Sequence, residues 1–218
     1  GRNWDYPNVN VVVPEPSTTG MEDPLNFNSL KVSTISAMTN WNHVTGPGYI
    51  DFFAYNSSEE SANILDFIYN SVAVIPTDSR LFFPIGYNSA AYFRYAVDDF
   101  NLSDDDDYMT FIYQNLNYAN NNVNGDYQNS VIFLNGTGDI AWFNQYPPPD
   151  PSPPEYLPTH DVEAVITHEF GHILGLSHNN INGSLMSENG AARIVDDPVR
   201  EAIGALYVID VNSAVIYK

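Results

Sequence analysis

The sequence contains no cysteine and very few cationic residues. Its 218 residues include 7 Lys and Arg against 27 Asp and Glu, so the formal net charge is −20. The lack of cysteine excludes a disulfide scaffold, a cysteine nucleophile and every metal site built from thiolates. The excess of acid, with no basic run, argues against nucleic acid or an anionic membrane surface as a partner. Hydrophobic residues make up 44 % of the chain, which is typical of a protein folded around a core.

Two further absences bear on where the protein acts. No apolar stretch reaches the ~18 residues that a membrane-spanning helix needs, so we expect no membrane span. Residues 1–20 lack the basic and then apolar pattern of a signal peptide. The surface composition, rich in Asp and poor in Lys, favours a secreted or extracellular protein, either free or at the cell surface. Four Asn-x-Ser/Thr sequons agree with that, although so much Asn and Ser also produces sequons by chance; they begin at Asn56, Asn101, Asn135 and Asn182.

Hydrophobic periodicity and turn signals predict a chain of alternating strands and helices. A helix is predicted over 29–42, with Ser29 as its N-cap and an apolar face formed by Leu30, Ala37, Met38 and Trp41. Residues 147–158 contain seven prolines, and we interpret them as a rigid surface loop within one domain. The predicted strands are 9–13, 49–55, 130–134 and 141–143, with several more between 64 and 100 whose number and pairing stay open.

One segment, from His168 to His178, carries most of the chemistry. The helix that carries its first part is predicted to begin after a cap at Asp161 or Thr159. Residues four apart on a helix lie on one side, so His168 and His172 aim at a common point. Gly175 can adopt the left-handed conformation that ends a helix, and the chain can then bring His178 back to that point. Three neutral imidazoles leave a tetrahedral zinc ion one open position for water, as in catalytic zinc sites.

This pattern, H-E-x-x-H-x-x-G-x-x-H, resembles the extended motif of the metzincin metallopeptidases, which is followed by a Met-turn. Met186 in Ser184-Leu-Met-Ser187 is the candidate methionine of that turn. Within the metzincins, the segment 168–176 and the C-terminal segment 196–207 are most similar to the matrixin (matrix metalloproteinase) family. Residues 41–45 resemble the end of that family's first long helix, whereas 56–128 match no pattern that we can name.

The resemblance implies an α+β fold, a metzincin-like or zincin catalytic domain with a twisted mixed five-stranded sheet, two long helices and a C-terminal helix. We expect one domain over residues 1–218, with an N-terminal subdomain of about 1–175 and a C-terminal subdomain of about 176–218. In the last helix Asp197 is the expected N-cap, and the expected core stripe is Val199, Ala202, Ile203 and Leu206.

The resemblance also implies a zinc metalloendopeptidase that hydrolyses peptide bonds of extracellular proteins. His168, His172 and His178 would hold one catalytic zinc ion, and Met186 would play a structural role beneath it. Glu169 would take a proton from the zinc-bound water and deliver it to the leaving amine. The substrate would be a protein or peptide lying along an edge strand within 79–97, and the enzyme is expected to be a monomer.

Two other functions stay open at this point. A non-catalytic protein- or glycan-binding module of the same fold would retain zinc for structure, but such a site has no need of the carboxylate of Glu169. A metzincin of another family would keep the chemistry and change the specificity. The lack of a tyrosine two residues after Met186 argues against the astacin and serralysin types.

The remaining candidates concern additional ions and the specificity pocket. The run Asp104–Asp107 is interpreted either as a calcium site or as a solvated acidic loop. Matrixins carry a second, structural zinc in a cluster of histidines and aspartates, but His43 and His160 lie in no such cluster, so we expect no structural zinc. After Met186, Ser-Glu-Asn-Gly replaces the Tyr-Pro pair that helps to form the family's specificity pocket, so the preferred cleavage site stays open.

Overall fold

The structure is a computed structural model that places the functional segment and the elements around it. The acidic run Asp104–Asp107 and residues 147–157 of the proline-rich segment lie outside the residues that it describes. None of the helices within the described residues is long and apolar enough to cross a membrane. The described residues are 8–13, 27–45, 51–55, 71–77, 80, 83–86, 89–96, 129–144, 158–188 and 192–207.

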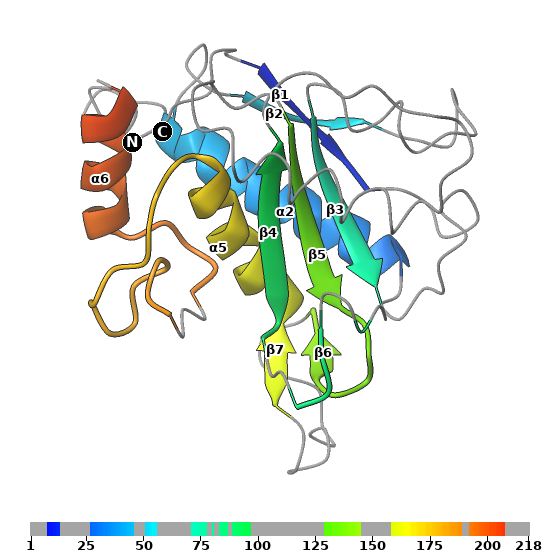
Figure 1. Cartoon of the computed structure of the whole chain (residues 1–218). Coiled ribbons are helices and arrows are strands. Elements are labelled where there is room, and N and C mark those ends of the chain that lie inside the picture. The colour runs from blue at the N-terminus through cyan, green and yellow to red at the C-terminus, as the bar shows by residue number, and fades with distance from the viewer. Residues whose placement is uncertain are drawn as a thin grey trace.

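The main sheet has the strand order β2-β1-β3-β5-β4 (Figure 1). Neighbouring strands run parallel, except that β4 at one edge is antiparallel to β5. The strands predicted at 9–13, 49–55 and 130–134 are confirmed, and the region 64–100 supplies two more. The strands are β1 (Asn8–Val12), β2 (Asp51–Tyr55), β3 (Ser71–Thr77), β4 (Ala91–Ala96) and β5 (Asn129–Asn135).

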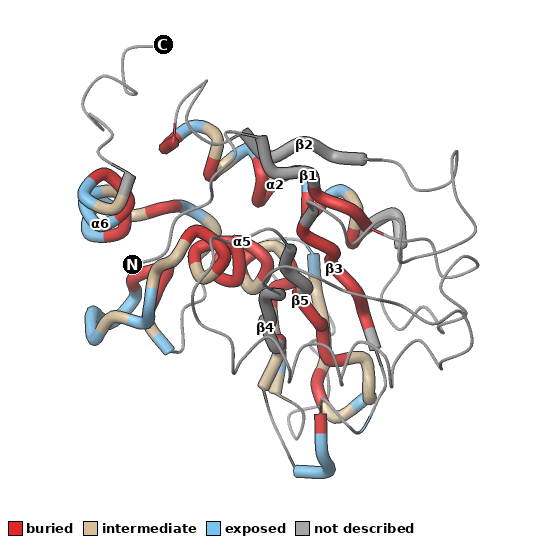
Figure 2. Tube along the Cα trace, turned by 45° about the horizontal axis from the view of Figure 1, so that its top comes forward, coloured by how far each residue is buried: buried red, intermediate tan, exposed pale blue. Residues whose placement is uncertain are grey.

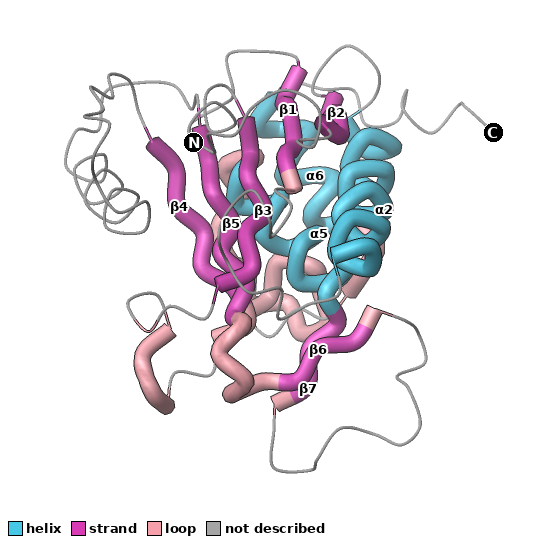
Figure 3. Tube along the Cα trace, turned by 90° about the vertical axis from the view of Figure 1, so that its right-hand side faces the viewer, coloured by secondary structure: helices cyan, strands magenta, loops and turns pink. Residues whose placement is uncertain are grey.

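Two helices, α2 (Phe27–Thr45) and α5 (Val162–Ile173), lie on the same face of this sheet (Figure 3). Helix α2 begins two residues before Ser29, so Ser29 lies in the first turn and is not the N-cap. Several polar residue types suited to a cap precede the apolar stripe, and spacing alone does not choose among them. The helix ends at Thr45, three residues beyond the predicted end at residue 42 and directly before Gly46-Pro47-Gly48 in the sequence.

The hydrophobic core fills the layer between the sheet and these helices. The four residues predicted for the buried face of α2, Leu30, Ala37, Met38 and Trp41, are all buried. Helix α5 is buried along most of its length (Figure 2). It is therefore held in place by apolar packing on several sides rather than by its own propensity. The core cluster that includes the apolar residues of α5 also contains residues of β3, β5 and α2, namely Val72, Val74, Ile132, Leu134, Trp41 and Val44.

A small second sheet leads the chain into α5. It consists of β6 (Ala141–Phe143), which was predicted, and β7 (Thr159–Asp161), which pairs with it in parallel and was not. The turn between β5 and β6 is organised by Asn135, whose amide donates to the Ser89 carbonyl at 3.0 Å. The same side chain accepts from the Thr137 hydroxyl at 2.7 Å and is buried, so this sequon asparagine shapes a turn and does not face solvent.

The C-terminal helix α6 (Asp197–Tyr207) begins one residue earlier than predicted, because Asp197 was expected to be its N-cap and instead lies within the helix. Asp196, rather than Asp197, is its cap: the Asp196 carboxylate accepts from the Val199 amide at 3.4 Å, and the Asp196 carbonyl accepts from the Arg200 amide at 2.9 Å. Two adjacent aspartates satisfy the capping preference equally well in sequence. Val199 and Ile203 are buried as predicted, whereas Ala202 is exposed.

Candidate metal centre

Helix α5 begins and ends where the sequence predicts, and these bounds determine where the histidines lie. Asp161 caps it, because the Asp161 carboxylate accepts from the amides of Glu163 at 3.0 Å and Ala164 at 3.3 Å. After the helix, Gly175 has a φ of +93°, the left-handed conformation that glycine adopts without steric cost. The Gly175 amide donates to the His172 carbonyl at 2.9 Å, so the chain turns sharply here.

The turn brings three imidazoles together. The Nε2 atoms of His168, His172 and His178 lie 3.1 Å from one another in every pair. Within the described part of the chain, these residues are the only group of three or more His, Cys, Asp or Glu placed to hold a metal ion. His168 is buried, His172 is half-buried and His178 is exposed, so the cluster opens to solvent on the His178 side.

The outer nitrogens of two of these rings are fixed by backbone carbonyls. His168 Nδ1 donates to the Leu185 carbonyl at 2.6 Å, and His172 Nδ1 donates to the Leu176 carbonyl at 2.8 Å. Burial lowers the pKa of His168 to about 4 and also lowers the pKa of His172, so both rings are neutral near pH 7. Each ring therefore carries its one proton on Nδ1 and presents a bare lone pair at Nε2.

This donor set fits a zinc ion. Two Nε2 lone pairs that face each other at 3.1 Å cannot form a hydrogen bond, and a cation between them turns their repulsion into attraction. Tetrahedral zinc, with zinc–nitrogen distances of about 2.0–2.1 Å, requires its nitrogens to lie about 3.3–3.4 Å apart, close to the spacing observed. Three such ligands leave one coordination position for another molecule.

Glu169 follows His168 on α5 and is only 9 % exposed. Burial raises the pKa of its carboxyl to about 8. A neighbouring cation lowers the pKa of a carboxyl, so the charge on Glu169 depends on whether the cluster holds a metal ion. A buried carboxyl of this kind is suited to taking up and releasing a proton near neutral pH.

Beneath the helix lies the turn that contains Met186. The Ser187 amide donates to the Ser184 carbonyl at 3.2 Å, which closes the turn. The Met186 side chain is 1 % exposed and lies against Gly171, where an added Cβ would be 2.3 Å from its Sδ atom. On another side, Trp41 donates from Nε1 to the Thr167 carbonyl at 2.8 Å. Met186 was predicted from its spacing, and Trp41 was predicted to be buried, but the hydrogen bond from Trp41 to α5 and the orienting carbonyls of Leu176 and Leu185 were not predicted.

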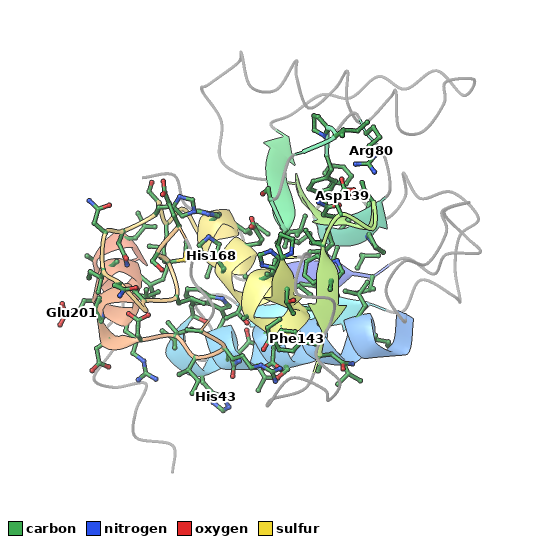
Figure 4. All side chains as sticks on the ribbon, turned by 90° about the horizontal axis from the view of Figure 1, so that it is seen from below. His43, Arg80, Asp139, Phe143, His168 and Glu201 are labelled. Atoms are coloured by element: carbon green, nitrogen blue, oxygen red, sulfur yellow. The ribbon has the colours of Figure 1, made fainter. Side chains whose placement is uncertain are left out.

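The other candidates from the sequence do not join the cluster. His43 is exposed at the end of α2, well apart from His168 (Figure 4). His160 is half-buried in β7 beside Trp142, with a distance of 6.0 Å between ring centroids, and burial lowers its pKa. Because Asp104–Asp107 lies outside the described residues, a calcium site there stays a prediction.

Comparison with known proteins gives the family. No curated protein matches the chain. A family model described as matrixin matches residues 19–202, which is far more than half of the 218 residues and includes the helix with the three-histidine cluster. Matrixins are zinc metallopeptidases of α+β fold, and the resemblance predicted from the sequence is confirmed. The chain belongs to the matrixin family.

Proposed function

We propose that the protein is a zinc-dependent endopeptidase that hydrolyses peptide bonds of extracellular proteins. The observation that carries this proposal is the convergence of three imidazole Nε2 atoms at 3.1 Å, on rings whose other nitrogens are held by carbonyls at His168 and His172. Membership of the matrixin family supports the same activity. A secreted location is part of this proposal, supported by the acidic composition and by the exposed sequon asparagine Asn182.

The chemistry divides between the metal and Glu169. His168, His172 and His178 would hold a zinc ion, which would act as a Lewis acid that polarises a carbonyl and lowers the pKa of bound water toward ~7. Glu169 accepts the proton of the attacking water and then delivers it to the amine of the leaving peptide. Burial raises the pKa of this carboxyl, and a bound cation would lower it again, so that the carboxylate could accept a proton from water and pass it to the leaving amine.

The edge strand β4 is the proposed site for an extended substrate. It lies within the range 79–97 predicted for this role, and its free edge carries backbone groups that no other described strand pairs. A peptide can bind such an edge as an additional strand, with main-chain hydrogen bonds that do not depend on its sequence. We further propose one catalytic domain over 1–218, divided near residue 175, that acts as a monomer.

The test is the replacement of Glu169 in the zinc-loaded protein. Glu169→Gln removes the base but keeps the shape, so we expect unchanged zinc content and a loss of peptide cleavage of about 10²–10⁴-fold. Glu201→Gln, at an exposed acid on α6 (Figure 4), is the control and should cleave like the parent. Zinc content is measured by elemental analysis and cleavage by profiling a peptide library. Parental cleavage by Glu169→Gln contradicts the assignment of the base, and a zinc-loaded parent that cleaves no peptide favours the binding module.

A further inference from the structure

A chain of hydrogen bonds links the start of α6 to the most buried ligand of the proposed zinc site. His168 Nδ1 donates to the Leu185 carbonyl at 2.6 Å. The amide of the same residue, Leu185, donates to Asp196 Oδ2 at 2.6 Å. Leu185 is 0 % exposed, so its backbone is held between the histidine ring and the carboxylate with no access for competing water.

The Asp196 carboxylate makes further contacts with the same turn. The Ser184 hydroxyl lies 3.0 Å from Oδ2 and 3.2 Å from Oδ1, and it donates to this carboxylate. Oδ1 also accepts from the Val199 amide in the first turn of α6. Hydrogen bonds to an ionised acceptor are shorter and stronger than neutral ones. A single charged group therefore fixes two successive residues of the Met186 turn to the start of the last helix.

The two ligands on α5 differ in how their orienting carbonyls are placed. The partner of His172 is the Leu176 carbonyl, four residues further along, which the left-handed turn at Gly175 sets locally. The partner of His168 is the Leu185 carbonyl, 17 residues away and in a turn closed by its own 3.2 Å hydrogen bond. A carbonyl at that separation is only as well positioned as the turn that carries it, and Asp196 anchors this turn through the Leu185 amide.

We propose that Asp196 is a positioning residue for the metal centre. It holds the Leu185 carbonyl, and through that carbonyl it fixes the tautomer and the ring orientation of His168. Groups that orient a metal-bound histidine from outside typically change metal affinity 10–100-fold when they are removed. The inference rests on the proposed function only in taking the three histidines as zinc ligands, and it concerns zinc affinity rather than cleavage.

The experiment compares Asp196 with Arg193, three residues earlier in the same segment. Arg193 also anchors this segment to α5 by charged hydrogen bonds, but at the opposite end of the helix, to Asp161 and Glu163. Zinc affinity is measured by competition with a chromogenic chelator, and stability by thermal unfolding of the metal-free protein. We expect Asp196→Ala and Arg193→Gln both to lower the melting temperature. Only Asp196→Ala should weaken zinc binding, by about 10–100-fold.

A conservative variant separates positioning from general loss of structure. Asp196→Asn keeps the size of the side chain and one oxygen that can accept from the Leu185 amide, so it should recover part of the zinc affinity. If Asp196→Ala does not fold, Asp196→Asn and Ser184→Ala take its place. Ser184→Ala removes one donor to the carboxylate, and each of the two variants should lose less zinc affinity than expected for Asp196→Ala. Zinc affinity equal to that of Arg193→Gln in all Asp196 variants overturns the proposal. If the parent binds zinc but cleaves no peptide, the proposed function fails while this comparison still stands.

Discussion

The two ends of α5 are held by opposite kinds of contact. At its start, Asp161 and Glu163 pair with Arg193, with N···O distances of 2.6 and 2.9 Å. In its second half, the cluster rings of His168 and His172 are oriented by neutral backbone carbonyls. A carbonyl acceptor orients an imidazole without adding the negative charge that favours its protonated form. The arrangement keeps the ion pairs away from the rings that must stay neutral to bind a metal ion.

The same contrast applies to packing. The Arg193 side chain is 25 % exposed, so the start of α5 is held by charges that partly face water and respond to salt. The second half is held by close contact with Met186 and Trp41, which responds to volume and not to salt. Changes in side-chain volume should therefore act on the second half of α5, and changes in charge on its start.

The largest effect is expected from Met186→Ala. The side chain is 1 % exposed, and removal of a buried methionine costs about 2–5 kcal/mol of unfolding free energy, because it leaves a cavity next to α5. Denaturant unfolding of the metal-free protein measures this loss. Raising the salt concentration should leave the difference in unfolding free energy between variant and parent unchanged, because the methionine side chain carries no charge.

Gly171→Ala provides the control for this contact, because its sign depends on Met186. In the parent, the new Cβ would lie 2.3 Å from the Met186 Sδ and 3.2 Å from Trp41 Cζ2, and such overpacking costs about 1–3 kcal/mol. In the Met186→Ala background the sulfur is gone, and the better helix propensity of alanine contributes up to ~1 kcal/mol of stability. We expect Gly171→Ala to destabilise the parent and to be neutral or stabilising in the variant. The same loss in both backgrounds contradicts close contact at Gly171.

A smaller effect is expected from Arg193→Gln at the start of the helix. It removes two charged hydrogen bonds from carboxylates that are 8 % and 12 % exposed, at a cost of about 2 kcal/mol. Salt screens the attraction that the variant loses, and at 1 M salt the Debye length is about 3 Å. The difference in unfolding free energy between variant and parent should therefore be smaller at 1 M salt. A difference that is independent of salt would show that Arg193 acts by packing, and it would remove the contrast between the two ends.

The sequence predicts one side of this contrast better than the other. His168, His172, Gly175 and His178 follow from helical spacing and from the conformational freedom of glycine, both of which are local rules. The Arg193 pairs join residues about 30 positions apart, and no local pattern marks them.

The errors at helix boundaries have the same cause, because they also depend on contacts between residues far apart in the sequence. So do the contacts around the site that the sequence did not predict. Asp196 and Asp197 are equivalent by capping preference, and only the contacts of Asp196 with Ser184 and Leu185 separate them. Trp41 was correctly predicted to be buried, because burial follows from periodicity. Its hydrogen bond to the Thr167 carbonyl joins two helices and depends on how they pack.

The smallest effect is expected from Ser36→Ala, which tests whether the charged end of α5 acts as a unit. The Ser36 hydroxyl donates to Glu163 Oε1 at 2.7 Å, while Arg193 binds the other oxygen of the same carboxylate. Loss of this hydrogen bond should cost about 0.5–1.5 kcal/mol. Thr39→Ala on the same helix removes only an exposed hydrogen bond to the Ile35 carbonyl, so it should stay within about 0.5 kcal/mol of the parent.

The double variant Ser36→Ala/Arg193→Gln then measures the coupling between the two contacts. Once Arg193 is gone, Glu163 is free to turn toward water, and its hydrogen bond with Ser36 no longer holds an ordered carboxylate. The cost of Ser36→Ala should therefore be smaller in the Arg193→Gln background than in the parent, by at least about 0.5 kcal/mol. Strict additivity would mean that Ser36 and Arg193 hold α5 independently. The start of the helix would then be a set of separate contacts, unlike its second half, where the effect of Gly171→Ala depends on Met186.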